Sequence, residues 1–220
     1  LSGIDTRDHS AGGEPWLPQR EANLELLEWC RSDPRLLPVA VCQPGLAGAD
    51  EIEAQLSLYK FFGLKFHPFP LNLDANDPAY DPFMEAAAAA RLPAVFHAAP
   101  GCSDPEKICE LAARHPRVPT VLYHINLTGY IHDGIRAVKQ YLKREMADLY
   151  LELSWVPAEY IKDAVAAVGH ERVIFGTDAP LDGPDHYDWY RESFRAIEAL
   201  GSAAAEAILE GNSRQVFRLP

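Results

Sequence analysis

Three short apolar segments of this chain each end in a residue that can bind a metal ion. The three residues are His97, His124 and Asp178. If the segments form neighbouring parallel strands, their carboxyl ends meet at one mouth of the fold. Imidazole and carboxylate groups are common ligands of divalent cations such as zinc. The pattern therefore predicts one shared site that contains all three side chains.

The phase of each segment indicates the direction in which these side chains point. Residues two apart on a strand lie on the same face, so His97 should share a face with Val95, and His124 with Leu122. We predict that this is the inner face of a barrel-like sheet. The structural alternative for each terminal residue is a place in a loop or at the start of the next helix, with no part in chemistry.

Asp178 stands at the abrupt end of an apolar run, in the sequence Gly176-Thr-Asp-Ala-Pro180. We expect it to be buried, and a buried carboxylate is costly unless it is paired or coordinates a metal. It could bind the ion, accept a proton from a metal-bound water, or do both during turnover. Alternatively, it would cap a helix that follows Pro180.

A second pair of candidates, Lys65 and His67, lies on one face of the segment 63–67. A lysine at the mouth of a barrel could bind an anionic substrate or, if carbamylated, bridge two metal ions. Its structural alternative is an ion pair with Glu152 or another buried acid. His124 also has two interpretations, because it could either bind the metal or orient and polarise the substrate.

Composition limits the classes of protein to which the chain can belong. Its 220 residues are enough for one large domain, and no linker divides residues 1–220. The net charge of −12 argues against a nucleic-acid partner, which needs concentrated Lys and Arg, but not against a small anionic substrate. No apolar stretch approaches the roughly 20 residues that span a bilayer, and no secretory signal is evident. We therefore expect a cytoplasmic protein with no membrane partner.

The elements that must position these residues follow from the alternation of helical periodicity with short apolar runs, which predicts βα units around a parallel sheet. Strands are predicted around Val39, Lys65, Val95, Leu122, Leu151 and Ile174. Helices are predicted over 19–32, 50–62, 81–91, 103–115, 131–142, 157–169, 185–200 and 202–209. Ser103 is expected to open a capping box. A (β/α)8 TIM-type barrel has eight strands and about 250 residues. We expect such an α/β barrel. Its first strand or strands would be missing from this chain, because residues 1–18 show no strand pattern. An open sheet is the alternative.

Together and in order, these segments resemble the amidohydrolase-related branch of the metal-dependent hydrolases, which have a TIM-barrel fold. The resemblance runs from about residue 38 to residue 219. It matches 63–68 to the family's fourth strand, 92–97 to the fifth with the metal ligand His97, 115–124 to the sixth with His124, 172–180 to the eighth with the catalytic Asp178, and 208–217 to the closing segment with Asn212. Singly these motifs are weak, but the ordered set is specific.

One departure from the family pattern concerns its first strand, which carries a His-x-His pair that supplies two metal ligands. No His-x-His occurs in this sequence, and His9 is a single histidine among polar residues. The resemblance then implies that the remaining ligands belong to a strand upstream of Leu1. Without that strand, a metal site would contain His97, Asp178 and at most His124.

The resemblance implies a metal-dependent hydrolase that cleaves an amide, ester or lactone bond of a small molecule. One divalent metal, zinc by preference with manganese or iron as alternatives, would activate water while Asp178 moves the proton. Lys65 and His67 would contact the substrate. Two other functions stay open: a decarboxylase of the same family, and a metal-free barrel that binds a ligand or partner. A homodimer is common among such enzymes.

Three aromatic residues lie in or near the loops after the predicted strands and could line the pocket. Packing in the core is the alternative for each of them: Tyr130, Trp155 and Trp189.

Overall fold

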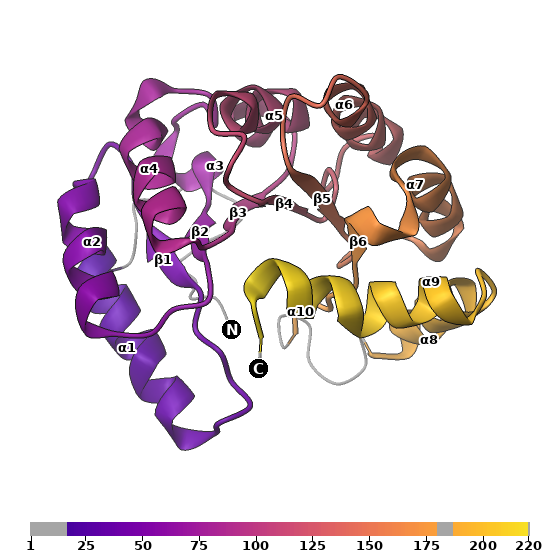
Figure 1. The fold of residues 1–220 in the computed structure, drawn as a ribbon, viewed down its shortest axis with the longest axis horizontal. Helices are drawn as coiled ribbons and strands as arrows, with labels where there is room; N and C mark the ends of the chain where they lie inside the picture. The colour runs from indigo at the N-terminus through magenta and orange to yellow at the C-terminus, as the bar shows by residue number, and fades with distance from the viewer. Residues whose placement is uncertain (1–16, 180–186, 220) are drawn as a thin grey trace.

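The architecture is a curved sheet of parallel strands wrapped by helices. A computed structural model describes residues 17–179 and 187–219. Its six strands lie in sequence order and each neighbouring pair is parallel (Figure 1). They are β1 Ala40–Cys42, β2 Leu64–Phe66, β3 Ala94–His97, β4 Thr120–Tyr123, β5 Leu149–Glu152 and β6 Val173–Ile174. Sequential order with helical connections is the arrangement of a TIM-type barrel, as predicted.

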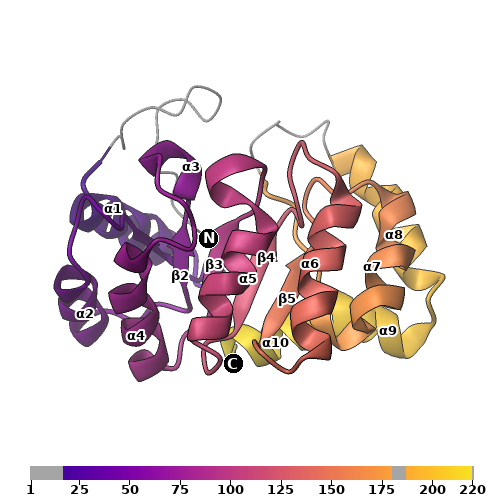
Figure 2. The ribbon, with the colours of Figure 1, turned by 90° about the horizontal axis from the view of Figure 1, so that it is seen from above.

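Helices connect the strands and cover the convex outer face of the sheet (Figures 1 and 2). Each amphipathic segment must bury its apolar side, which explains the alternation with the strands. The helices are α1 Gln19–Ser32, α2 Ala49–Leu58, α3 Pro68–Leu71, α4 Asp81–Ala90, α5 Pro105–Arg114, α6 Ile131–Lys143, α7 Ile161–Val168, α8 Tyr187–Glu198, α9 Ser202–Glu206 and α10 Asn212–Phe217. Short 3-10 turns occur at Pro78–Tyr80, Gly101–Ser103, Ala158–Tyr160 and His170–Arg172, and a π-helical turn, Ala207–Gly211, joins α9 to α10.

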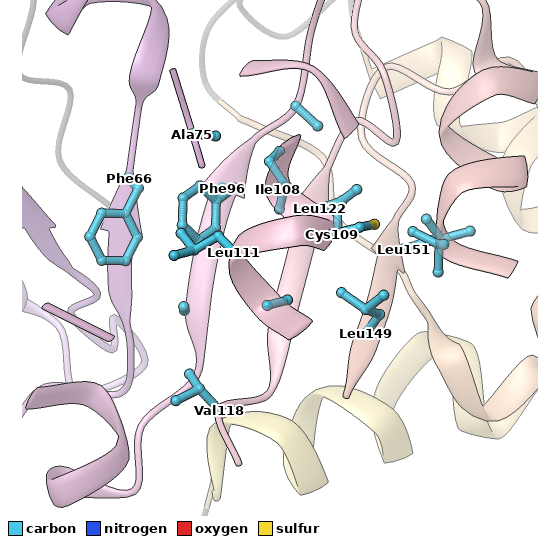
Figure 3. Close-up of a cluster of buried hydrophobic side chains, with 14 of the residues drawn as sticks. Phe66, Ala75, Phe96, Ile108, Cys109, Leu111, Val118, Leu122, Leu149 and Leu151 are labelled. Atoms are coloured by element: carbon cyan, nitrogen blue, oxygen red, sulfur yellow. The ribbon is translucent and has the colours of Figure 1, made fainter. Parts of the chain in front are cut away.

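The larger hydrophobic core lies between the outer face of the sheet and these helices. Phe66, Phe96, Leu122 and Leu151 belong to it and are fully buried (Figure 3). Phe66 and Phe96 stack with their ring centroids 4.7 Å apart. Side chains alternate along each strand, so the residue before or after each of these four points to the opposite, hollow face of the sheet.

A second, smaller core fills the amino-terminal half of that hollow side. It consists of Val39, Val95, Val121, Tyr150 and Ile174 together with Val216 of α10, with Tyr123 and Phe217 packed against them. Asn212, at the start of α10, donates from Nδ2 to the backbone carbonyls of His170 and Val173, each at 2.7 Å. The helix α10 therefore packs against the amino-terminal half of the inner face and lies at that end of the strands, which leaves the carboxyl end of the inner face to other residues (Figure 2).

Some predicted boundaries differ from the structure. The helix predicted over 50–62 ends early, at Leu58, because the next residue takes an extended conformation. Ser103 does not cap α5. The side chain of Asp104 does so instead, accepting a hydrogen bond of 2.9 Å from the backbone N–H of Glu106.

The six predicted strands are confirmed, and β1 and β6 form the two edges of the sheet in the described part of the chain. The predicted shortfall of strands falls on residues 1–18, of which residues 1–16 lie outside the described residues. Within residues 17–179 and 187–219, no helix is long and apolar enough to cross a bilayer.

Candidate active site

The carboxyl end of the inner face carries three histidine side chains in a row. His67 follows β2, His97 ends β3 and His124 follows β4. The ring centroids of His67 and His97 are 4.3 Å apart, and those of His97 and His124 are 4.9 Å apart. His67 and His124 are buried, whereas His97 is half-buried. The structure therefore brings His97 and His124 together and places His67 beside them.

His124 reaches this row by a route that strand alternation does not predict. Leu122 belongs to the outer core, so alternation would place His124 there as well. Instead, His124 has a φ of +68°, in the left-handed region. This change of backbone direction ends β4 and brings the ring beside that of His97. The predicted inner position of Leu122 is therefore wrong, whereas Val95, which shares a face with His97, does lie in the inner core.

Glu152, the last residue of β5, supports His124 through a set of hydrogen bonds. Its Oε2 accepts from the backbone N–H of His124 at 3.1 Å and from the hydroxyl of Ser154 at 2.6 Å. Its Oε1 accepts from the backbone N–H of Ser154 at 3.1 Å. The Ser154 hydroxyl also lies 2.8 Å from Nδ1 of His124. Glu152 and Ser154 thus position both the backbone and the ring of His124.

These contacts favour a proton on Nδ1 of His124. Nδ1 lies 3.2 Å from the backbone carbonyl oxygen of Ser154, and a carbonyl oxygen can only accept. An Nδ1–H that donates to this carbonyl, while the Ser154 hydroxyl donates to Glu152, leaves the lone pair of a neutral ring on Nε2. Histidines that bind metals commonly donate their other N–H to a carbonyl or carboxylate in this way. The arrangement suits His124 to act as a ligand through Nε2.

The buried carboxylate at this mouth is Glu152, not Asp178 as predicted. Glu152 is 4% exposed, whereas Asp178 is an exposed residue. Burial raises the pKa of Glu152 to about 7, although hydrogen bonds from Ser154 and the His124 N–H lower it, and the charge of Asp178 raises it further. The argument that a buried acid needs a partner therefore applies to Glu152, and its hydrogen bonds supply that partner.

Asp178 lies at the mouth on the segment that follows β6. Its Oδ2 accepts a hydrogen bond of 3.0 Å from the indole Nε1 of Trp155. Asp178 and Trp155 both have a left-handed φ, of 54° and 61°. Such strain at residues other than glycine is concentrated at functional sites. The alternative, that Asp178 caps a helix after Pro180, concerns residues 180–186, which lie outside the described residues.

Of the three aromatic residues predicted near the pocket, Trp155 contacts a predicted site residue through this hydrogen bond. Tyr130 is 81% exposed, and the side chain of Trp189 lies outside the described residues.

Lys65 lies on β2, on the inner face two residues before His67. It is buried, and its Nζ is 4.2 Å from the centroid of the Tyr123 ring, a cation–π arrangement. Burial raises the pKa of Tyr123, and the charges of Glu152 and Asp178 raise it further, so its phenol stays neutral at physiological pH. Lys65 and Tyr123 therefore add a cation and a neutral hydroxyl to the inner wall.

The donor types at this mouth fit a divalent cation, but the described residues do not complete a site. Imidazole nitrogen and carboxylate oxygen are ligands for zinc and manganese. Within residues 17–179 and 187–219, however, no three His, Cys, Asp or Glu side chains are placed to hold a metal ion. The ligand set of His97, His124 and Asp178 therefore stays a prediction.

From the sequence, Glu152 is predicted only as a possible ion-pair partner of Lys65, and its contact with His124 is a finding of the structure. A signal for this role was present, since Glu152 ends a buried strand in the same way that His97 does. Ser154 and Tyr123 are not predicted as site residues from the sequence, because a serine after a strand and a tyrosine within one have no distinctive pattern.

Parallel βα repetition with polar side chains at the carboxyl ends of the strands defines an α/β protein of the TIM-barrel type, with a site where such enzymes have theirs. A comparison with protein families matches residues 15–219 to the family described as amidohydrolase. The chain therefore belongs to the amidohydrolase family, which confirms the resemblance. A comparison with curated proteins gave no match.

Solved structures share the fold. The 5-carboxyvanillate decarboxylase from Sphingomonas paucimobilis has a TM-score of 0.69 at 19% identity, over 100% of this chain and 78% of that chain. A dihydroxybenzoic acid decarboxylase from a Polaromonas species, with bound manganese and the inhibitor 2-nitroresorcinol, has a TM-score of 0.69 at 21% identity. The match covers 91% of this chain and 75% of that chain. An amidohydrolase from Burkholderia multivorans with bound zinc has a TM-score of 0.70 at 16% identity, and the match covers 91% of this chain and 80% of that chain. At these identities the similarity establishes the fold alone.

Proposed function

We propose that this protein is a metal-dependent decarboxylase of a small aromatic carboxylic acid. The observation that carries the proposal is a buried cation, Lys65, on the inner wall beside the histidines, where it can bind a substrate carboxylate. Tyr123 and Trp155 supply aromatic surface at the same mouth. Two of the similar solved structures are decarboxylases of aromatic acids, which supports the same substrate class.

Asp178 would deliver the proton that this reaction needs. Decarboxylation breaks the bond between the carboxylate carbon and the ring carbon, releases CO2 and leaves an electron pair on the ring carbon, which takes up one proton. The Asp178 carboxyl group lies at the mouth, oriented by the indole N–H of Trp155. His97, His124 and Asp178 would contribute to the binding of a divalent metal, together with ligands from outside the described residues, and the metal would supply a Lewis acid that polarises the oxygen atoms of the substrate. Lys65 and His67 would position the substrate.

Hydrolysis of an amide, ester or lactone is the second candidate, and the exposure of Asp178 is compatible with it. An exposed carboxylate could accept a proton from an attacking water as readily as deliver one to carbon. The similarity to the zinc-bound amidohydrolase supports the same candidate.

A substrate panel separates the two reactions. Hydroxybenzoates are assayed for CO2 release, and amides, esters and lactones for acid release. We expect CO2 release from at least one hydroxybenzoate, with loss of about 10²–10⁴-fold in kcat for Asp178→Asn. The matched control is Asp133→Asn, a half-buried acid paired with Arg136 on α6, which should keep full activity. Turnover of lactones or amides alone would replace decarboxylation by hydrolysis, and an active Asp178→Asn variant would remove Asp178 from the mechanism.

Metal content tests the cofactor. Purified protein should carry manganese, zinc or iron at about one ion per chain, chelation should abolish turnover, and metal addition should restore it. A metal content far below one ion per chain, together with intact ligand binding, would instead favour a barrel that binds without chemistry.

A further inference from the structure

A basic cavity lies at the amino end of the strands, opposite the mouth that carries the histidines. Its volume is about 500 Å³. The carboxyl ends of α4 and α5, the turn that leads into β4 and the residue after α10 form its walls. Its charged lining consists of Arg91, Arg114, Arg117 and Arg218 together with Glu85, and His115 also contributes.

Three of the four guanidinium groups have no acidic partner among the described residues. Arg114 is paired with Asp81, with Nε 3.0 Å from Oδ1. Arg91, Arg117 and Arg218 form no salt bridge with any side chain of residues 17–179 and 187–219. In a chain with a net charge of −12, this cluster creates a local positive potential in an otherwise negative field.

The backbone at two of these arginines supports a role for their side chains. Arg91 ends α4 and Arg218 ends α10, both with a left-handed φ, of 56° and 51°. Glycine is the usual residue at such a position because it has no Cβ to strain. Arginine at a helix end also complements the helix dipole, a structural role that fits Arg91 and Arg218. It does not explain Arg117, which lies in the turn after α5.

We infer that this cavity binds a small polyanion that carries several phosphate or carboxylate groups. An exposed ion pair contributes little on its own, so a ligand with a single charge would not be retained. A ligand that contacts three or four guanidinium groups at once can form two parallel hydrogen bonds with each of them, and these add to its affinity. The volume lies within the range of about 300–1,000 Å³ that is typical of small-molecule sites. The inference is independent of the proposed decarboxylation.

Titration calorimetry of the intact chain with inorganic triphosphate and with citrate tests the inference and separates the two ligand chemistries. We expect saturable binding of at least one of them at a single site, weakened as salt is added. The double variant Arg91→Ala/Arg117→Ala should bind at least 10-fold more weakly. Glu85→Gln should bind several-fold more tightly, because it removes the acidic group from the lining.

The matched control is Arg31→Ala/Arg136→Ala, which removes two exposed arginines from ion pairs on α1 and α6. It should bind as the unmodified chain does. Absence of saturable binding of either anion at low salt would overturn the inference. An equal loss of affinity in the control variant would also overturn it, because the binding would then depend on overall charge.

Discussion

A Cβ atom on residue 176 would lie 1.8 Å from Oε1 of Glu152, so Gly176 makes room for that carboxylate. Residue 176 belongs to the segment after β6, whereas Glu152 ends the neighbouring strand β5. Glu152 in turn accepts the backbone N–H of His124 at 3.1 Å. The glycine after β6 therefore influences the histidine after β4 through the acid at the end of β5, which lies between them.

Gly176→Ala should lower the free energy of unfolding by about 1–3 kcal/mol, the usual cost of overpacking. It should also reduce activity, because Glu152 must move away from His124. Urea unfolding measures the first effect. The control is Gly211→Ala, which has a helical backbone and its nearest neighbouring atom at 3.6 Å. That variant should be unchanged or up to about 1 kcal/mol more stable. If the two variants have equal free energies of unfolding, the close approach of a Cβ at residue 176 to Oε1 of Glu152 does not affect stability.

Trp155→Phe keeps an aromatic ring but removes the N–H that holds Oδ2 of Asp178. A hydrogen bond to a charged group contributes about 1.5–3 kcal/mol, so kcat should fall by about 10- to 100-fold. KM should change little, since the ring remains. Steady-state kinetics measure both. Trp29→Phe, at a side chain on α1 that is 57% exposed, serves as the control and should behave as the parent. Unchanged kcat in Trp155→Phe would show that Asp178 needs no such support.

Asn212→Ala should destabilise the fold by about 1–3 kcal/mol, because the carbonyls of His170 and Val173 would lose their buried donor. Thermal unfolding followed by circular dichroism measures the loss. Asn76→Ala is the control, since its hydrogen bond to Glu110 is exposed. Equal melting temperatures for the two variants would mean that Asn212 does not fasten α10 to β6.

The stabilising effect of Asp81 should depend on pH. Burial raises the pKa of Asp81, but hydrogen bonds from His115 and Arg114, and their charges, lower it by more, so the net shift is downward. Because the folded pKa lies below the unfolded value of about 3.9, the carboxylate stabilises the fold above that pH. This contribution is lost as the pH falls through the folded pKa.

Asp81→Asn should therefore lower the free energy of unfolding by roughly 1 kcal/mol at neutral pH. The difference from the parent should shrink toward zero in strong acid. Urea unfolding at a series of pH values checks this. A difference that stays constant with pH would show that the charge of Asp81 is not responsible.

The order and periodicity of the chain were enough to predict six parallel strands, and the resemblance carried by the ordered motifs added the family and its TIM-type barrel. They also placed His97 on the inner face, because its position follows from Val95 by alternation along one strand. These conclusions rest on local rules, in which a side chain's direction depends on residues close to it in sequence. The helix boundaries that failed, such as the cap at Ser103, depend on a choice between neighbouring polar residues.

Only the tertiary structure decided how His124, Glu152 and Asp178 meet. The left-handed φ of His124 has no signature in a hydrophobic pattern, and it reverses the face that alternation predicts. Glu152 is buried because Gly176, in the segment after the neighbouring strand β6, leaves space for it, and Asp178 is exposed although it follows a buried strand. Each of these facts depends on contacts between residues far apart in sequence, which the packing of the whole sheet determines and no local periodicity records.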